Sequence, residues 1–178
     1  MAFIVQVKDK KFELYLSETE IQDQIKKIAI AINKDYVGRR PLFIAILNGS
    51  FMFASDLFKQ LTIDAELCFI KLALYKGMTS SGQVLSAIGL DVDLFEKDII
   101  IIEDIVDTGK TLNEFIPKLI HQQPASLKIA ALLNKPDALE FPIPVDYLGF
   151  SIPNKFVVGY GLDYDGLGRN FKEIYQLV

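Results

Sequence analysis

The sequence predicts an α/β fold: a doubly wound, mostly parallel β-sheet flanked by helices. Short aliphatic runs alternate with segments in which apolar residues recur at helical spacing, as in βαβ units. The clearest strand, residues 99–102, is four isoleucines in succession, which suits a parallel strand buried on both faces. The 178 residues are close to the usual size of one domain. We therefore expect a single domain over residues 1–178, with a core of about residues 17–150.

The first helix is predicted to begin at residue 17. Ser17 and Glu20 form a capping-box pattern, and the apolar residues that follow share one helical face: Ile21, Ile25, Ile28, Ala29 and Ile32. This helix should end before residues 39–41, which read Arg-Arg-Pro. The next unit follows as a buried strand, a turn and a helix: residues 42–47, 48–50 and 51–61.

The middle of the chain predicts a long strand and a lid. Residues 63–74 are mostly apolar and read as a strand, whereas residues 75–82 are polar and rich in Gly and Ser, which favours a mobile segment. Residues 84–90 can return as a strand. Further along, residues 128–133 and 145–150 read as two more strands. Three prolines keep the segment between them irregular: Pro136, Pro142 and Pro144.

Acidic residues follow the isoleucine run at once. Glu103 and Asp104 come directly after residue 102, and Asp107 follows three positions later. In open α/β sheets, ligands bind just outside the carboxyl ends of the strands, so these carboxylates stand where a ligand would bind. Successive strand residues point to opposite faces. Glu103 and Asp104 can therefore face one ligand together only if the strand ends at them, and we expect that it does.

A short loop, residues 107–111 (Asp-Thr-Gly-Lys-Thr), leads from this strand into a helix predicted over about residues 111–121. The helix is indicated by apolar residues on one face: Leu112, Phe115, Ile116, Leu119 and Ile120. Free N–H groups and the helix dipole make the first turn a ready phosphate site. The loop adds hydroxyl groups, a charge and room for close backbone approach: Thr108, Thr111, Lys110 and Gly109. An ordinary helix cap does not explain why acids stand beside donors for a phosphate. Carboxylates and a bound phosphate repel each other unless a divalent metal or a polyhydroxyl ligand lies between them.

Two nucleotide-binding motifs are excluded, and the helix carries one conflict. Residues 109–111 match the end of a P-loop, but that motif needs a glycine where this chain has Asp104. Gly159 and Gly161 form no dinucleotide signature, because no βαβ unit surrounds them. Pro117 falls inside the predicted helix, where it removes a hydrogen bond and should bend the helix.

The two ends of the chain do not follow the strand–helix alternation. Residues 3–7, 156–159 and 171–178 are short β candidates without helices between them. We expect them to form a small hood over the carboxyl edge of the sheet, made of about residues 1–16 and 151–178.

Composition excludes several classes of protein. The net charge is −4, so no global electrostatic attraction favours nucleic acid or an anionic membrane as a partner. No run approaches 18 apolar residues, the length expected of a membrane-spanning helix. Cys68 is the only cysteine, which excludes an internal disulfide and suits a small buried side chain in a reducing compartment. We expect a soluble, cytoplasmic protein.

The acid-and-loop segment, residues 103–112, resembles the phosphoribosyl-diphosphate signature of the type I phosphoribosyltransferases. Four further segments resemble that family in the expected order: residues 47–53 (diphosphate loop), 74–82 (lid), and 131–135 and 155–164 (purine site), with Arg169 beyond. The resemblance covers about residues 5–178 and points to the branch that uses hypoxanthine and guanine.

The resemblance implies a reaction. The 5-phosphoribosyl group of phosphoribosyl diphosphate is transferred to a 6-oxopurine, hypoxanthine or guanine, giving IMP or GMP and diphosphate in purine salvage. Its transition state develops positive charge on the sugar while diphosphate leaves, so the site needs anionic groups near the ribose and cationic groups near the leaving group. Magnesium, which prefers oxygen ligands and commonly bridges phosphates, is the expected cofactor. A homodimer or homotetramer is also expected.

The resemblance also assigns roles to residues. The phosphoribosyl group and its 5-phosphate would be bound by Glu103, Asp104, Asp107, Thr108, Gly109, Lys110 and Thr111, with Asp107 as the general base. The diphosphate would be bound by Asn48, Gly49, Ser50, Tyr75 and Arg169. The metal ligands would be Glu103, Asp104 and Asp163, and the purine would be bound by Lys135, Phe156, Val157 and Asp163.

Without the resemblance, ordinary structural roles would be favoured for several of these residues. Lys135 and Arg169 would be solvated and Phe156 would be a core aromatic. In the family pattern, Lys135 would donate to the 6-oxo group, Phe156 would stack on the base, and the backbone of Val157 would read the edge of the base.

Two positions depart from the family pattern. Asn48 stands where many members have a basic residue, so backbone donors of residues 48–50 must carry more of the diphosphate binding. Leu74 replaces a serine in the lid, which loses a hydroxyl, while Tyr75 is kept.

Two other functions stay open: a phosphoribosyltransferase for another base, such as xanthine or a pyrimidine, and a nucleotide-sensing RNA-binding regulator on the same fold.

Overall fold

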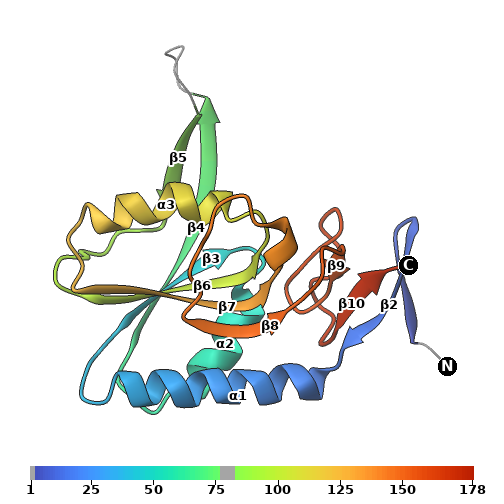
Figure 1. Ribbon diagram of the computed structural model, residues 1–178, viewed down its shortest axis with the longest axis horizontal. Coiled ribbons are helices and arrows are strands. Elements are labelled where there is room, and N and C mark those ends of the chain that lie inside the picture. The colour runs from blue at the N-terminus through green and yellow to red at the C-terminus, as the bar shows by residue number, and fades with distance from the viewer. Residues whose placement is uncertain (1–2, 77–82) are drawn as a thin grey trace.

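The structure is a computed structural model that describes residues 3–76 and 83–178. Its centre is a six-stranded sheet in the order β5-β4-β3-β6-β7-β8 (Figure 1). All neighbours in this sheet are parallel except β4 and β5, which are antiparallel. In that order the strands are Gln83–Ile88, Glu66–Lys76, Leu42–Leu47, Asp98–Val106, Ser126–Asn134 and Tyr147–Ser151. The expected mostly parallel, doubly wound sheet is confirmed.

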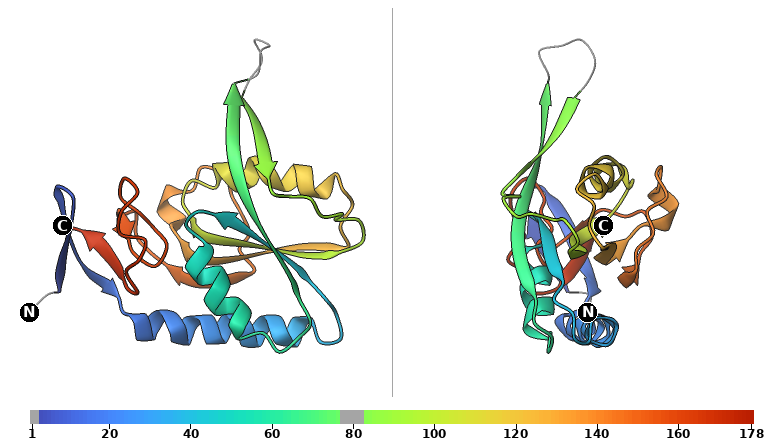
Figure 2. Two further views of the ribbon diagram at one scale, coloured as in Figure 1. Left: turned by 180° about the vertical axis from the view of Figure 1, so that it is seen from behind. Right: turned by 90° about the vertical axis from the view of Figure 1, so that its left-hand side faces the viewer.

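Helices cover both faces of the sheet (Figure 2). Ile100 and Ile102 of β6 pack in one core with α1 (Glu18–Asp35) and α2 (Phe51–Lys59). Ile99 and Ile101 pack on the opposite face with α3 (Lys110–Ile120). All four isoleucines are fully buried, as expected of a central strand. The capping box of α1 is present, since Ser17 and Glu20 bond reciprocally.

The hood is a second sheet of four strands in the order β1-β2-β10-β9. These strands are Ile4–Val7, Lys10–Leu16, Ile174–Leu177 and Val157–Val158. Three of them were predicted, but β2 was missed. Its sequence alternates Phe12, Leu14 and Leu16 on one face, which is the signal that identifies a half-buried strand. A small core of its own holds the hood together: Val7, Phe12, Val158 and Tyr175.

The lid prediction is tested only in part. Residues 75 and 76 belong to β4, which begins at residue 66 rather than 63 and runs to residue 76. Residues 77–82 lie outside the described residues. The returning strand is confirmed as β5, paired antiparallel with β4.

The expected end of β6 at the two acids was wrong. The strand continues to Val106, and its pairing with β7 resumes beyond the acids. The ladder is irregular at this point: Glu103 is paired with Ala131 and Ile105 with Leu133, whereas Asp104 is skipped. The Asp104 Oδ1 atom accepts the Ile105 N–H at 2.8 Å, which holds the side chain against its own backbone.

Pro117 lies inside α3, which continues across it as one helix to Ile120. The Pro117 carbonyl still accepts the His121 N–H at 3.0 Å, so the last turn is closed beyond the proline. Among the described residues, no helix combines the length and apolar character needed to cross a membrane.

Candidate active site

The predicted site residues converge where the carboxyl ends of β3, β6 and β7 meet the hood. The loop after β3 contributes residues 48–50, the end of β6 contributes the acids, and β7 is followed directly by Lys135. Hood residues reach this edge, because Gly161 packs on the Gly49 carbonyl and the Ile152 N–H donates to the Asn134 carbonyl at 2.8 Å.

The loop after β6 forms a small hollow at the start of α3. Gly109 is the N-cap of the helix and adopts a left-handed conformation with φ +79°. A Cβ atom at this position would lie 2.4 Å from the Phe141 carbonyl oxygen, so only glycine fits. A hollow of about 80 Å³ is lined by Glu103 and by residues 105–112. The first-turn N–H groups of α3 have no helical acceptors, which suits an anion at this position.

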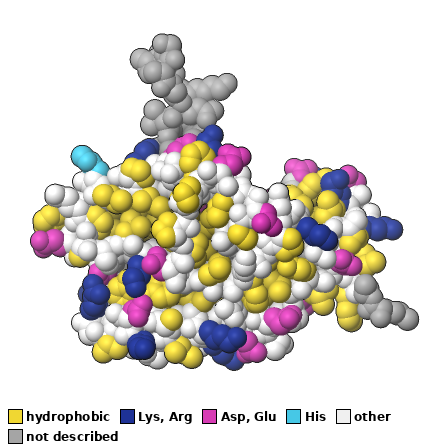
Figure 3. Space-filling model, in the orientation of Figure 1, with side chains coloured by type: hydrophobic (Ala, Val, Ile, Leu, Met, Phe, Trp, Pro, Cys, Tyr) yellow, Lys and Arg dark blue, Asp and Glu magenta, His cyan; other side chains and the backbone are white. Residues whose placement is uncertain are grey.

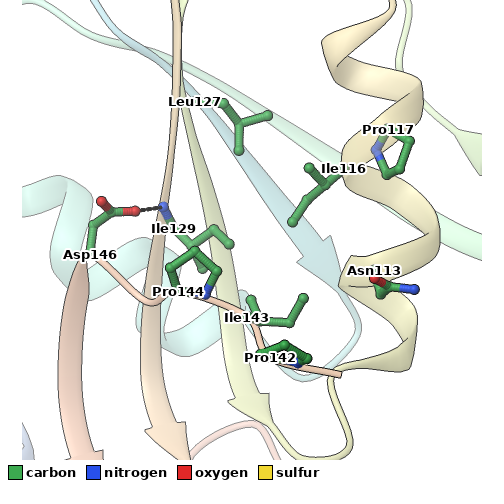
Figure 4. Close-up of a pocket in the computed structure, with 9 residues that line it drawn as sticks. All are labelled: Asn113, Ile116, Pro117, Leu127, Ile129, Pro142, Ile143, Pro144 and Asp146. Carbon is green, nitrogen blue, oxygen red and sulfur yellow. Dashed lines mark hydrogen bonds between the residues drawn. The ribbon is translucent and has the colours of Figure 1, made fainter. Parts of the chain in front are cut away.

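The back of this loop is held by the segment after β7. The N–H groups of Glu140 and Phe141 both donate to the Thr108 carbonyl at 3.0 Å. A second hollow, of about 270 Å³, lies further along α3, between the helix, β7 and this segment (Figure 4). Its lining is mainly aliphatic and proline, including Ile116, Ile129 and Ile143, which suits apolar contact rather than a phosphate.

The two acids face different parts of the site. Glu103 lines the hollow beside α3, whereas the Asp104 carboxylate lies against Gly49, where a Cβ atom would come within 1.5 Å of Asp104 Oδ2. Because β6 continues through them, the two side chains do not share one face, and the sequence-based expectation is corrected on this point. A ligand that contacts both acids must reach around the end of the strand.

Burial leaves both carboxylates poorly compensated. Burial, and then the nearby charge of Asp104, raise the pKa of Glu103 well above its usual value. The Glu103 Oε2 atom is buried and has no hydrogen-bond partner among the described residues. Burial also raises the pKa of Asp104 to about 6, although the Ile105 N–H and the charge of Arg169 act in the opposite direction. The groups near these two carboxylates therefore compensate their charges only in part, and a ligand or metal can supply the rest.

The diphosphate loop is packed closely against its surroundings. Ser50 is fully buried, and its hydroxyl donates to the Ile46 carbonyl at 2.6 Å. Because the Ser50 hydroxyl already donates within the protein, its backbone N–H is the group left to bind a diphosphate. Asn48 precedes Gly49 in this loop. The backbone of Tyr75 lies in β4 opposite Val84, and its side chain lies outside the described residues.

Arg169 and Asp163 form an ion pair in the hood. The distance between Arg169 Nη2 and Asp163 Oδ1 is 2.7 Å, and Arg169 Nη1 donates to the Gly161 carbonyl at 2.7 Å. Arg169 is therefore not a solvated side chain. Among residues 3–76 and 83–178, no three acidic, histidine or cysteine side chains gather around a single metal position. Glu103, Asp104 and Asp163 thus do not form a metal site made of protein alone.

The purine side of the site holds a buried lysine beside an exposed aromatic ring. Lys135 is 6% exposed, and its Nζ atom lies 3.2 Å from Asp107 Oδ2. Phe156 is 45% exposed, with its ring tilted against Phe12 and edge-on to Tyr164. Val157 is buried in β9. A solvated lysine and a core phenylalanine, the ordinary alternatives, are both contradicted.

Sequence reasoning missed the part that the turn after β9 plays in the site. Gly161 has φ +98°, and a Cβ atom there would lie 2.0 Å from the Gly49 carbonyl oxygen. The turn therefore touches the diphosphate loop directly. The signal was the pair of glycines at 159 and 161, which we considered only as a dinucleotide motif.

A parallel sheet with phosphate and acidic loops at its carboxyl edge, closed by a hood, defines the type I phosphoribosyltransferase class. The family model for the phosphoribosyl transferase domain matches residues 15–165. The chain belongs to this family.

The most informative relatives share one activity in their names. The chain is 42% identical to the hypoxanthine-guanine phosphoribosyltransferase of Lactococcus lactis over 91% of this chain and 89% of that protein. A hypoxanthine phosphoribosyltransferase structure from Staphylococcus aureus superposes with a TM-score of 0.86, at 39% identity over 93% of this chain and 91% of that one. A structure of the Trypanosoma cruzi hypoxanthine phosphoribosyl transferase superposes with a TM-score of 0.84, at 34% identity over 98% of this chain and 95% of that one. That protein was studied for the role of its C-terminal region in oligomeric state and activity.

Proposed function

We propose that this protein transfers the 5-phosphoribosyl group of phosphoribosyl diphosphate to hypoxanthine or guanine, releasing diphosphate in purine salvage. The observation that carries the proposal is Lys135, a buried ammonium group beside Asp107 and at the end of a central strand. A buried lysine is retained when a specific acceptor is available to it. The 6-oxo group of a purine is such an acceptor, and the relatives are named for 6-oxopurines.

The charges of the site fit the reaction. The loop at the start of α3 supplies N–H donors for the 5-phosphate, and Arg169 supplies positive charge on the hood side for the diphosphate. Glu103 and Asp104 lie between these two regions and can stabilise positive charge that develops on the ribose. Asp107 is half exposed, so it can accept a proton from the purine imidazole nitrogen while Lys135, 3.2 Å away, donates to the adjacent 6-oxo group.

Magnesium fits the same carboxylates as a substrate-borne ion. Glu103 has a buried oxygen without a partner, and burial raises the pKa of Asp104, so a cation would satisfy both groups. Because no three protein ligands converge in the described part of the chain, substrate oxygens and water would complete the coordination. Glu103, Asp104 and Asp163 are the residues we propose to hold it. When bound, magnesium neutralises the charge of the leaving diphosphate.

The test is a base panel. Wild-type protein with phosphoribosyl diphosphate and MgCl2 should convert hypoxanthine or guanine to the nucleotide, and removal of Mg2+ with EDTA should abolish turnover. Lys135→Met should raise KM for the 6-oxopurine by at least tenfold, because it removes the donor to the oxo group. Turnover of xanthine or uracil alone would contradict the proposal.

The RNA-binding alternative is disfavoured. On the face shown in Figure 3, Lys and Arg side chains are interspersed with Asp and Glu rather than gathered in a stripe.

We also propose that the protein assembles as a homodimer or homotetramer, as light scattering at several concentrations will test. A monomer at all concentrations would contradict this.

A further inference from the structure

Tyr160 occupies the tip of a two-residue hairpin turn at the active site. Gly159 and Leu162 exchange both backbone hydrogen bonds at 3.0 Å, so Tyr160 and Gly161 are the central residues of the turn. Both have positive φ angles, +48° and +98°. Such turns favour Gly, Asn or Asp, and the left-handed conformation is unfavourable for a bulky aromatic residue. Tyr160 is therefore held in this conformation by something other than local preference.

The side chain of Tyr160 provides that restraint. Its ring is 1% exposed, and its hydroxyl donates to Asp56 Oδ2 at 2.5 Å. Gln22 of α1 donates to the same oxygen at 2.8 Å, and Lys59 Nζ lies 2.6 Å from the other oxygen of Asp56. Burial, and then the bond to Asp56, raise the pKa of Tyr160, so the hydroxyl remains a donor. The turn is thus tied to both helices on one face of the sheet.

The same turn touches the substrate site on two sides. Gly161 packs on the Gly49 carbonyl, and Asp56 belongs to α2, which begins at the residue after the diphosphate loop. Val157 precedes the turn and Asp163 follows it. Arg169 bonds to the turn twice, because its carbonyl accepts the Gly161 N–H and its guanidinium donates to the Gly161 carbonyl. The position of the turn therefore sets the spacing between the diphosphate loop and the purine side of the hood.

We propose that Tyr160 is a positioning residue of the transfer reaction. Its hydroxyl, anchored on Asp56, holds the turn 159–162 so that residues 48–50 and the hood segment with Val157 and Asp163 meet at the distance that the two substrates require. The inference rests on the proposed function, since the substrates are those named above. Tyr160 itself contacts neither substrate.

The chain offers a matched control. Tyr147 is also buried, and its hydroxyl donates to Asp35 Oδ2 at 2.6 Å, so it makes the same type of bond to a helix α1 carboxylate. Tyr147 begins β8, at the amino edge of the sheet and opposite the substrate site. Tyr147→Phe and Tyr160→Phe should therefore lower thermal stability similarly. Only Tyr160→Phe should change the kinetics, with kcat/KM for phosphoribosyl diphosphate falling by roughly tenfold or more.

A conservative variant separates positioning from general damage. Asp56→Asn keeps an acceptor oxygen for the Tyr160 hydroxyl, so its kinetic constants should stay within about threefold of wild type, while Asp56→Ala should behave like Tyr160→Phe. The proposal would be overturned if Tyr160→Phe kept wild-type kinetic constants and only its melting temperature fell, as in Tyr147→Phe. Equal kinetic losses in both tyrosine variants would also overturn it.

The proposed function is tested separately by wild-type turnover. If the wild type turned over no 6-oxopurine, that function would be wrong, but the positioning role would still be measured by calorimetric binding of phosphoribosyl diphosphate with MgCl2. Tyr160→Phe should then bind at least tenfold more weakly than wild type, whereas Tyr147→Phe should bind equally. Equal binding by all three proteins would overturn the proposal.

Discussion

At the scale of single residues, the site is built from groups placed where they are individually unfavourable. Two carboxylates at the end of a central strand are partly buried and have raised pKa values. Lys135 is buried beside Asp107, and Tyr160 adopts a left-handed backbone conformation. Such placements lower stability and persist where binding or catalysis requires them. For the two carboxylates, stability and activity should therefore change in opposite directions.

Asp104→Asn should make the free protein more stable at neutral pH and inactive. The folded-state pKa of Asp104 is about 6, above that of an exposed aspartate, so the folded protein binds more protons between about pH 4 and 6. Stability contributed by this group is therefore lost as the pH rises through that window. Removing the charge should raise the free energy of unfolding at pH 7 by about 1–3 kcal/mol.

Thermal unfolding of both proteins from pH 4 to pH 8 will check this prediction. The melting temperature of Asp104→Asn should exceed that of wild type by several degrees at pH 7, and the difference should shrink toward pH 4. A variant that melts below wild type at pH 7 would show that Asp104 is compensated by partners in the free protein.

Asp107→Asn tests the proposed general base. If Asp107 accepts the purine proton, kcat should fall by about a hundredfold while KM for the purine changes little. Asp165→Asn is the matched control. Asp165 is an exposed hood aspartate paired with Lys8, and it has no assigned part in the reaction. Steady-state kinetics with saturating phosphoribosyl diphosphate will distinguish them. Near-normal turnover by Asp107→Asn would remove it from the base role.

Residue types and spacing predicted that the acids and the phosphate-type loop lie at one edge of the sheet, but not how the side chains are oriented. The acids and the Thr-Gly-Lys-Thr loop were found from sequence, because a strand, a loop and a helix in succession place them at one edge. Glu103 and Asp104 face different sides because β6 continues to Val106, and the end of that strand was misplaced from sequence. The glycines at 159 and 161 signalled a turn, but its contact with Gly49 joins distant segments and could not be predicted locally.

At the scale of elements, periodicity predicted most of the fold. The helices and the sheet strands have bounds within a few residues of those expected, because their apolar faces are buried against one another. Strand β2 lies in a small peripheral sheet, where only Phe12 is fully buried and most other side chains are partly buried, and its alternating apolar residues were overlooked. Pro117 remains the element-level exception, since it interrupts the hydrogen bonding of α3.

Pro117→Ala should stabilise the protein without changing its activity. Alanine restores a helical N–H donor, which favours the helix by up to about 3 kcal/mol, and a more flexible unfolded chain offsets part of this gain. We expect a net increase of about 1–2 kcal/mol in the free energy of unfolding, measured by denaturant titration.

The matched control for this helix is Pro142→Ala. Pro142 lies in the irregular segment before β8, where no helical bond can be restored, so this change should not stabilise. A decrease in stability for Pro117→Ala would mean that proline packing or unfolded-state rigidity outweighs the restored hydrogen bond. Kinetic constants should be unchanged, since Pro117 is two turns from the start of α3.

At the scale of the whole molecule, the site lies between two sheets. The main sheet supplies the loops after β3, β6 and β7, and the hood supplies the exposed ring of Phe156 and the Asp163–Arg169 pair. Neither sheet alone carries both Lys135 and Phe156, the two side chains that we propose bind the purine. The central claim is therefore that the 5-phosphate binds at the loop after β6, while the base binds between Lys135 of the main sheet and Phe156 of the hood, as in a 6-oxopurine phosphoribosyltransferase.

A crystal structure of the protein with GMP or IMP tests this claim most directly. We predict that the 5-phosphate accepts hydrogen bonds from backbone N–H groups of residues 108–111, that the base stacks on Phe156, and that Lys135 Nζ donates to the 6-oxo group. A phosphate on residues 48–50 instead, or a base away from both Phe156 and Lys135, would contradict the account.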